Sequence, residues 1–410
     1  MKKNFWVVAL ASVALVSCVN EVPVVGDNDK QPQELKFGDP MMSKQSRAVG
    51  EILGAKYPGD ESFVVYSVVH DGAFAGWENS LSWQSQHDND QTNDKIGDAP
   101  FFPLDGVIVS KSDVNNYWHI TGSTKYYWPK NEVVNGDTTD YKMTFAAYSP
   151  ASLGYPSDPT QKYADDINYD KNGLTITGYT MPDDPAKHFD LMFSTRTTDA
   201  ETSPIAINFK HALASIRFMF VKQAESTGGA HSITIKKVSL IGDISNKANF
   251  SQNITTIQES TGNPSWDNLA IIKNDNGTPG NPNDDTTKEY VLYNDAFTVP
   301  EGSSKEIEGI NSFMAIPQSV NGNMKVRIEY EVTMNVGDTP VTGLSRELPL
   351  IDFKKPSSTD YIQTWHRANR YVYTVQFGAL REIFFSPTIS EDWVTEGNAS
   401  FFSIGNVSQQ

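Results

Sequence analysis

Apolar and polar residues alternate along several short stretches of the chain, and this spacing of two predicts β-strands. From 324 to 332 every second residue is apolar, and mostly charged residues stand between them. This pattern is typical of an antiparallel strand with one face in the core. Residues 370–377 and 233–236 repeat it. Residues 63–69 are almost all β-branched or aromatic, which predicts a strand buried on both faces.

Helical spacing is weak throughout the sequence. Residues 361–367 are compatible with one short helical turn, but no long window carries an amphipathic stripe. Further short strands are predicted at residues 35–37, 126–128, 143–148, 174–177 and 205–209. Because Gly, Asn, Asp and Pro separate these stretches, we expect an all-β fold built from β-sandwiches. The segment 274–288, rich in the same residues, is expected to be a surface loop.

The N-terminus predicts export and lipid attachment. Lys2 and Lys3 precede an apolar run at 5–16 that is too short for a stable membrane span. The run ends in Leu-Val-Ser-Cys18, which looks like a bacterial lipobox whose cysteine thiol receives a diacylglycerol. We therefore predict a signal peptide at 1–17, lipidation at Cys18 and a tether with propeptide at 18–47. An ordinary secretory signal with a chance cysteine is the alternative.

Composition narrows the classes of function. Acidic residues outnumber basic ones by 50 to 33, and no basic cluster is visible, so a nucleic-acid partner is not expected. Cys18 is the only cysteine, so no disulfide can form within one molecule. The 410 residues suit two domains. We place the boundary in the polar stretch at 198–204, giving domains at 48–200 and 201–410.

Motifs of the common catalytic classes are absent from the sequence, so we expect no enzyme, no catalytic residue, no cofactor and no metal site. Residues 168–173 begin like a calcium-binding loop, but the twelfth position is Tyr179 where a glutamate is needed. An Asn-Gly hairpin turn is favoured there.

Several aromatic residues leave a second function open. They are Trp77, Trp83, Trp118, Trp128 and Tyr148. Together they could form a platform on which sugars stack, although core packing is the default for large aromatics. A surface glycan-binding lipoprotein is therefore the alternative function, and a hydrolase with paired carboxylates is the least supported one.

Three groups of motifs resemble the fimbrillin family of type V pilins. They are Tyr127-Trp128-Pro129 with 145–150; residues 190–194 with 209–218, which include His211; and 315–318 with 371–375 and Trp393. The resemblance implies two transthyretin-like antiparallel β-sandwich domains in tandem. It also implies an outer-membrane lipoprotein precursor that a trypsin-like or arginine-specific protease matures into a pilus (fimbrium) subunit supporting adhesion. By position we choose the bond between Arg47 and Ala48, with Lys44 as the alternative site.

The resemblance further suggests assembly by strand exchange between subunits. Cleavage would remove residues 35–37, and an extended segment of the next subunit would replace them in a head-to-tail polymer. Candidate donors are residues 383–393 and 401–404. Partners would be other pilin subunits, the maturation protease, membrane lipid through Cys18, and a host or glycan ligand. The position of the subunit (stalk, tip or anchor) stays open.

Overall fold

The computed structural model describes residues 34–42, 57–71, 102–103, 105–112, 117–128, 133–134, 137–138, 141–170, 173–199, 204–222, 232–253, 264–274, 286–302, 305–306, 312–353, 360–378 and 383–390. Within these ranges the helices are three short 3-10 turns: η2 (Ala151–Leu153), η3 (Pro185–Lys187) and η4 (Leu350–Asp352). Across the same ranges, no helix has the length and apolar character that crossing a membrane requires. The all-β prediction is confirmed.

The first sandwich pairs a seven-stranded sheet with a four-stranded sheet. The larger sheet has the order β1-β11-β10-β7-β2-β3-β4. Its strands are β1 (Met41–Met42), β2 (Phe63–Asp71), β3 (Val107–Lys111), β4 (Trp118–Ile120), β7 (Tyr141–Ser149), β10 (Met192–Asp199) and β11 (Asn208–His211). The smaller sheet, in the order β15-β14-β9-β8, contains β8 (Asp166–Asp170), β9 (Gly173–Thr180), β14 (Lys247–Asn253) and β15 (Pro264–Ala270). Aromatic pairs join the two sheets: the ring centroids of Tyr66 and Tyr169 lie 5.3 Å apart, as do those of Phe193 and Phe250.

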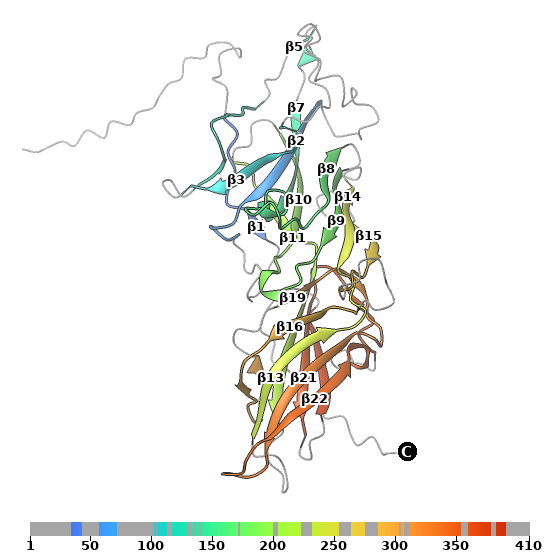
Figure 1. Ribbon diagram of the computed structural model, residues 1–410. Coiled ribbons are helices and arrows are strands. Elements are labelled where there is room, and N and C mark those ends of the chain that lie inside the picture. Colours follow the sequence, from blue (N-terminus) through green and yellow to red (C-terminus); the bar gives the residue numbers. More distant parts are fainter. Residues whose placement is uncertain are drawn as a thin grey trace, which may run out of the picture.

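The second sandwich lies below the first in Figure 1 and holds the orange and red part of the chain. One sheet has the order β18-β12-β24-β25, with β19 also on β12; the other has the order β16-β13-β21-β22, with β17 also on β13. The first consists of β12 (Ala214–Lys222), β18 (Lys305–Glu306), β19 (Phe313–Ala315), β24 (Arg370–Phe377) and β25 (Ile383–Ser390). The second consists of β13 (Ser232–Ile241), β16 (Glu289–Tyr293), β17 (Phe297–Thr298), β21 (Lys325–Thr333) and β22 (Val341–Pro349).

Two further strand pairs lie outside these sheets. They are β20 (Gln318–Ser319) with β23 (Thr364–Trp365), and β5 (Val133–Val134) with β6 (Asp137–Thr138). Most ladders are antiparallel, but β1 pairs with β11 and β12 pairs with β24 in parallel. The sandwiches are therefore mostly antiparallel, with parallel pairing at these two ladders.

Most strand predictions are confirmed, and three local ones are wrong. In β21 buried and half-exposed residues alternate along the whole strand, as the sequence pattern predicts. The predicted helical turn at 361–367 is instead extended and contains β23. Of the predicted strand at 126–128, Tyr127 makes only an isolated bridge, to Glu34. Of the predicted strand at 35–37, Phe37 makes only isolated bridges, to Trp118 and Ile205. The hairpin expected near residue 172 is confirmed because Asp170 pairs with Gly173, whose φ of +114° suits glycine.

The sheets are shared across residue 200, where the sequence suggests a domain boundary. Strand β9 precedes this point and pairs with β14, which follows it. Strand β11 also follows it and pairs with β10 in the first sandwich. One continuous apolar cluster extends from Val64 in β2 to Phe377 in β24. The two sandwiches therefore share a core.

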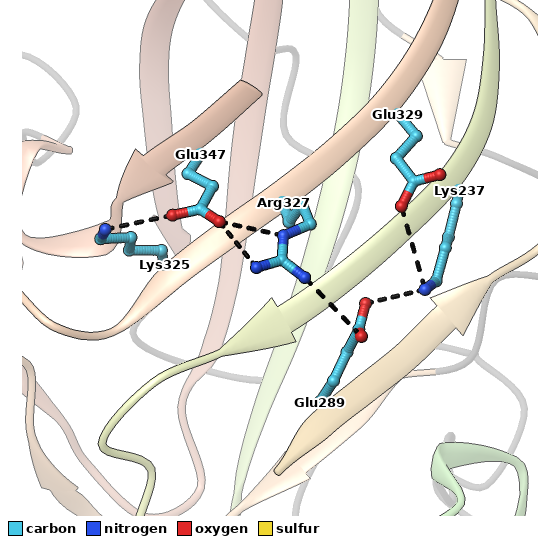
Figure 2. A network of polar contacts seen from close by, with 6 residues as sticks. All are labelled: Lys237, Glu289, Lys325, Arg327, Glu329 and Glu347. Carbon is cyan, nitrogen blue, oxygen red and sulfur yellow. Dashed lines mark hydrogen bonds and ion pairs between the residues drawn. The ribbon is translucent and has the colours of Figure 1, made fainter. Parts of the chain in front are cut away.

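The outer face of the β16-β13-β21-β22 sheet carries a network of charged side chains (Figure 2). Arg327 lies between two carboxylates, 2.7 Å from Glu347 and 3.7 Å from Glu289. Lys325 contacts Glu347 and Lys237 contacts Glu289, at 3.1 and 2.8 Å. The Lys325–Glu347, Arg327–Glu347 and Lys237–Glu289 pairs join neighbouring strands, whereas the Arg327–Glu289 pair reaches across β13.

Candidate functional site: the N-terminal segment on the seven-stranded sheet

The seven-stranded sheet is apolar on both of its faces. Val64, Tyr66 and Val68 face the core shared by the two sandwiches, whereas Phe63 and Val65 point to the opposite side. On that opposite side Phe145 and other apolar residues form a second cluster. A large apolar face needs a cover, since its exposure to water is unfavourable.

Residues 34–42, which we call the N-terminal segment, form part of this cover. Leu35 and Phe37 are 4% and 3% exposed, and Lys36 between them faces solvent. The ring of Phe37 lies edge-on to Phe63 and Phe145, with centroids 6.3 and 6.2 Å apart. Burial of these two side chains contributes about 3–6 kcal/mol.

Backbone hydrogen bonds hold the N-terminal segment on both sides. On one side the N–H of Leu35 donates to the carbonyl of Tyr126 at 2.8 Å. On the other side Gly38 and Met41 donate to Ile205 and Ile207, both at 2.8 Å. Strand β1 continues this side as a parallel pair with β11. The segment thus occupies the place of a strand between two neighbouring stretches of chain.

Polar side chains fix the position of the segment. The indole N–H of Trp118 donates to Oδ1 of Asp39 at 3.1 Å. At the exposed end, Nζ of Lys125 lies 3.4 Å from Oε2 of Glu34, a contact that solvent weakens. The Trp118–Asp39 bond was not foreseen because residues separated by 79 positions carry no shared pattern in the sequence.

Tyr57 packs beside the segment. Its N–H donates to the carbonyl of Pro40 at 3.4 Å, and its ring stacks on Phe209 at 5.3 Å. Burial raises the pKa of the Tyr57 hydroxyl, which shares a 2.7 Å hydrogen bond with Ser149. The phenol therefore stays neutral and packs in the second apolar cluster.

Most of the other predicted site residues lie outside the part of the chain that the structure describes. Cys18, Arg47, Ala48 and Lys44 lie outside the described residues, as does Trp393. Of the candidate donors, 383–390 forms β25, which pairs with β24 of its own chain, and 401–404 lies outside the described part.

The glycan platform loses three of its five candidate residues. Trp118, Trp128 and Tyr148 are at most 6% exposed and pack in the two apolar clusters. A sugar ring cannot stack on them, so the core interpretation is confirmed for these three. Trp77 and Trp83 lie outside the described residues.

His211 and Asp190 form a buried pair inside the protein. Nδ1 of His211 lies 2.6 Å from Oδ2 of Asp190, and both side chains are fully buried. His211 ends β11, just ahead of β12, so the expected structural role agrees with its place. Among the described residues no group of three or more His, Cys, Asp or Glu could hold a metal ion.

The fold and the docked segment define an all-β protein that carries a strand-like N-terminal segment over an apolar sheet face. The sequence model described as fimbrillin-like matches residues 83–393. The chain therefore belongs to the fimbrillin-like family. Membership in this family supports a role as a pilus subunit at the cell surface, and it agrees with the expectation of a structural protein and not an enzyme.

Comparison with known proteins adds the following. No curated protein matches the chain. A fimbrial protein from Bacteroides vulgatus is 15% identical at a TM-score of 0.49, covering 81% of this chain and 93% of its own. A fimbrilin from Porphyromonas gingivalis is 9% identical at a TM-score of 0.35, covering 90% and 99%. The tip fimbrial protein Mfa3 from the same species, with a C-terminal truncation, is 11% identical at a TM-score of 0.29, covering 86% and 99%.

Proposed function

We propose that this chain is a structural, accessory or tip subunit of a type V pilus that assembles by strand exchange and supports adhesion. It is exported as a lipoprotein through Cys18, held at the outer membrane, and then cut between Arg47 and Ala48. The cut releases the lipid anchor together with the N-terminal segment. The mature subunit then joins other pilin subunits in the fimbrium.

One observation carries this proposal: the segment that covers the apolar groove ends shortly before Arg47. Residues 34–42 are bonded on both sides and bury Leu35 and Phe37. Arg47 follows five residues after Met42 in the sequence. A single cut there separates the segment, with its edge strand β1, from the other six strands of the sheet.

The physical consequence is a groove that requires a new occupant. Loss of the segment leaves the carbonyls of Tyr126, Ile205 and Ile207 without their backbone donors. It also uncovers the rings of Phe63 and Phe145. An extended segment satisfies both needs, because it supplies N–H groups and alternating side chains together.

The test is limited trypsin digestion of the purified full-length precursor. We expect one early cut that leaves Ala48 as the new N-terminal residue, followed by polymer visible by light scattering and electron microscopy. An Arg47→Ala variant should lose both results, and a Lys44→Ala variant serves as the matched control. If Lys44→Ala and not Arg47→Ala blocks the cut, the cleavage site is wrong. If wild-type protein is cut at Ala48 and stays monomeric, the assembly proposal fails.

A further inference from the structure

We propose that the seven-stranded sheet binds a small monocarboxylate, meaning a carboxylate group on a short apolar body. The site lies at one end of the barrel that the N-terminal segment closes. Ser67, Trp128, Ser194 and Arg196 form it around the ring of Phe145, and each of these four contributes a buried polar atom without a hydrogen-bond partner. Binding at this site does not depend on strand exchange or on the proposed cut.

The N-terminal segment closes the seven-stranded sheet into a barrel. Strands β1 and β4 stand at the two ends of the sheet order. The segment contains β1, which pairs with β11, and it also reaches β4, because Phe37 makes an isolated bridge to Trp118. The second apolar cluster therefore fills the interior of a barrel. Side chains on the inner face of a barrel point towards a common axis, so groups from different strands can meet there.

Strand alternation places Ser67, Ser194 and Arg196 on this inner face. In β2, Val65 belongs to the second apolar cluster, and Ser67 is the next residue on the same side of the strand. In β10, Met192 belongs to that cluster, and Ser194 and Arg196 follow it at every second position. Three polar side chains therefore point into an interior that is otherwise apolar.

The strand register brings these side chains to one level of the barrel. Phe145 in β7 lies opposite Ser67 on one side and opposite Arg196 on the other. Ser194 precedes Arg196 by one inward position on β10. Trp128 reaches the same level, because its ring lies edge-on to Phe145 with the centroids 6.3 Å apart. The four polar side chains therefore gather around Phe145.

Each of the four side chains has a buried polar atom that lacks a partner. In the part of the chain that the structure describes, no hydrogen bond is made by Oγ of Ser67, Nε1 of Trp128, Oγ of Ser194 or Nε of Arg196. Ser67, Ser194 and Trp128 are 0%, 3% and 6% exposed, so bulk water does not replace the missing partners. Because most buried polar groups in folded proteins are hydrogen-bonded, four such atoms at one level of a barrel point to a bound polar group.

The hydrogen-bonding capacity of these atoms favours a carboxylate as the bound group. The indole N–H of Trp128 and the Nε–H of Arg196 only donate, and the hydroxyls of Ser67 and Ser194 donate as well. A carboxylate accepts about four hydrogen bonds through its two oxygens, which is one for each of these groups. An ordered water molecule is neutral and would leave the positive charge of Arg196 uncompensated, which is unfavourable because this side chain is partly buried.

The apolar surroundings select a small anion that also has an apolar body. Met143 is the next inward residue of β7 beyond Phe145, and it is fully buried. The ring of Phe102 lies 6.4 Å from that of Phe145. A strongly hydrated anion such as phosphate loses its water unfavourably against these side chains. Arg196 is partly exposed and its Nε is buried, so its side chain runs from the surface to the interior and marks the entrance.

Isothermal titration calorimetry of the full-length protein with sodium butyrate tests the site. We expect saturable binding, with 1-butanol and inorganic phosphate each at least about 10-fold weaker, because the alcohol lacks the charge and phosphate lacks the apolar body. Arg196→Gln should weaken butyrate binding about 10- to 100-fold, since a charge-assisted hydrogen bond is lost. Arg346→Gln is the matched control and should bind like wild type, because Arg346 is exposed on β22 of the second sandwich.

The indole N–H resonance of Trp128 in a nuclear magnetic resonance spectrum locates the ligand. In isotope-labelled protein this resonance is identified by its absence from the spectrum of Trp128→Phe. We expect it to shift on addition of butyrate and to saturate with the affinity found by calorimetry. Ser67→Ala and Ser194→Ala remove one hydroxyl each without a large change of volume, and each should weaken butyrate binding about 10-fold.

Four results would overturn the carboxylate site. Equal butyrate affinity in wild type and Arg196→Gln would show that Arg196 does not hold the ligand. A Trp128 resonance that stays in place would show that ordered water alone meets these polar atoms. Equal binding of 1-butanol and butyrate would show an apolar site without carboxylate recognition, and equal binding of phosphate would show a general anion site.

The serine variants keep the test decisive if Arg196→Gln fails to fold. Butyrate affinity that is unchanged in both Ser67→Ala and Ser194→Ala would then overturn the site, and weaker binding in both would support it. Formation of polymer is a separate measurement. A protein that binds butyrate as described but never polymerises would support this site and contradict the proposed assembly.

Discussion

Phe37 and Trp118 make side-chain contacts that add to the backbone hydrogen bonds and the buried Leu35 in holding the N-terminal segment. Phe37 supplies an apolar ring in contact with two others, and Trp118 supplies a directed hydrogen bond to Asp39. Both contacts would end if the proposed cut released the segment. The strength with which the segment docks therefore depends in part on a few side chains.

Replacement of Phe37 by alanine should loosen the segment without unfolding the sandwiches. Loss of the ring costs about 3 kcal/mol of docking, which corresponds to roughly 100-fold faster local opening. Hydrogen exchange at the amide of Gly38, which donates to Ile205, measures this opening. Lys36→Ala is the matched control because its side chain faces solvent. Equal exchange in the two variants would show that Phe37 does not hold the segment.

His188 should make the protein less stable as the solution becomes acidic. Its Nδ1 accepts from the N–H of Met314 at 3.1 Å and its Nε2 donates to the carbonyl of Pro182 at 2.9 Å. Burial lowers the pKa of His188 to about 4, below the value near 6.5 of an unfolded chain. Between these two values the unfolded state binds the extra proton, so stability falls as pH decreases through this range, by about 3 kcal/mol in total.

Urea unfolding at pH 7, 5.5 and 4.5 checks this prediction. A His188→Gln variant should lose the part of the pH dependence that histidine causes, although its stability at pH 7 is lower. His366→Gln is the control, because His366 is exposed. If His188→Gln and wild type decline in parallel from pH 6.5 to 4, His188 is not the titrating group.

Ion pairs between β21 and β22 help to hold these two neighbouring strands together. Glu347 accepts from Nε and Nη2 of Arg327 at 3.0 and 2.7 Å, and from Lys325 at 3.1 Å. These hydrogen bonds lower the pKa of Glu347. When the pKa of a glutamate is lower in the folded state than in the unfolded state, its ionisation stabilises the fold at pH values above the unfolded-state pKa. This stabilisation is lost as the pH falls through the folded-state pKa.

A double-mutant cycle on Arg327 and Glu347 should give a coupling of about 0.5–1 kcal/mol, because both side chains are partly exposed. Arg327→Gln, Glu347→Gln and the double variant are compared by urea unfolding at low salt. The coupling energy should decrease in 1 M salt, because the Debye length is then about 3 Å and the salt screens the two charges from each other. Arg327→Gln with Glu331→Gln is the control cycle, since Glu331 contacts Lys236 instead. A coupling as large in the control cycle would contradict the pairing shown in Figure 2.

At the scale of the whole molecule, the two sandwiches share one apolar core. The larger apolar cluster contains residues from strands of both. Trp266 in β15 donates to the carbonyl of Ala212, between β11 and β12. The short stretch around Ala212 thus connects the first sandwich with the second.

We therefore expect one cooperative unfolding transition for the chain, although its length is typical of proteins that unfold in steps. Tryptophan fluorescence and far-ultraviolet circular dichroism should give the same urea midpoint. A fragment of residues 48–200 should not fold alone, because β9 loses β14 and β10 loses β11. A folded 48–200 fragment, or two separated midpoints, would instead support independent domains divided at residue 200.

The alternating patterns at 324–332 and 370–377 were enough to predict β21 and β24. A strand with one buried face has an apolar residue at every second position, and this spacing is visible in the sequence. The short turn at 361–367 was mispredicted because β23 is defined by its partner β20, far away in the sequence. The sequence predicts a short strand at 35–37. The structure has only isolated bridges there, at Phe37, but Leu35 and Phe37 are both buried.

By itself, then, the sequence determined the all-β class, the resemblance to the family and the apolar residues of the N-terminal segment, since these are properties of local order and composition. Only the tertiary structure decided that this segment lies between Tyr126 and Ile205, that Trp118 binds Asp39, and that both sandwiches share one core. Contacts between residues far apart in the chain depend on how strands are ordered in a sheet. Many strand orders satisfy the same alternation of side chains, so the alternation cannot choose among them.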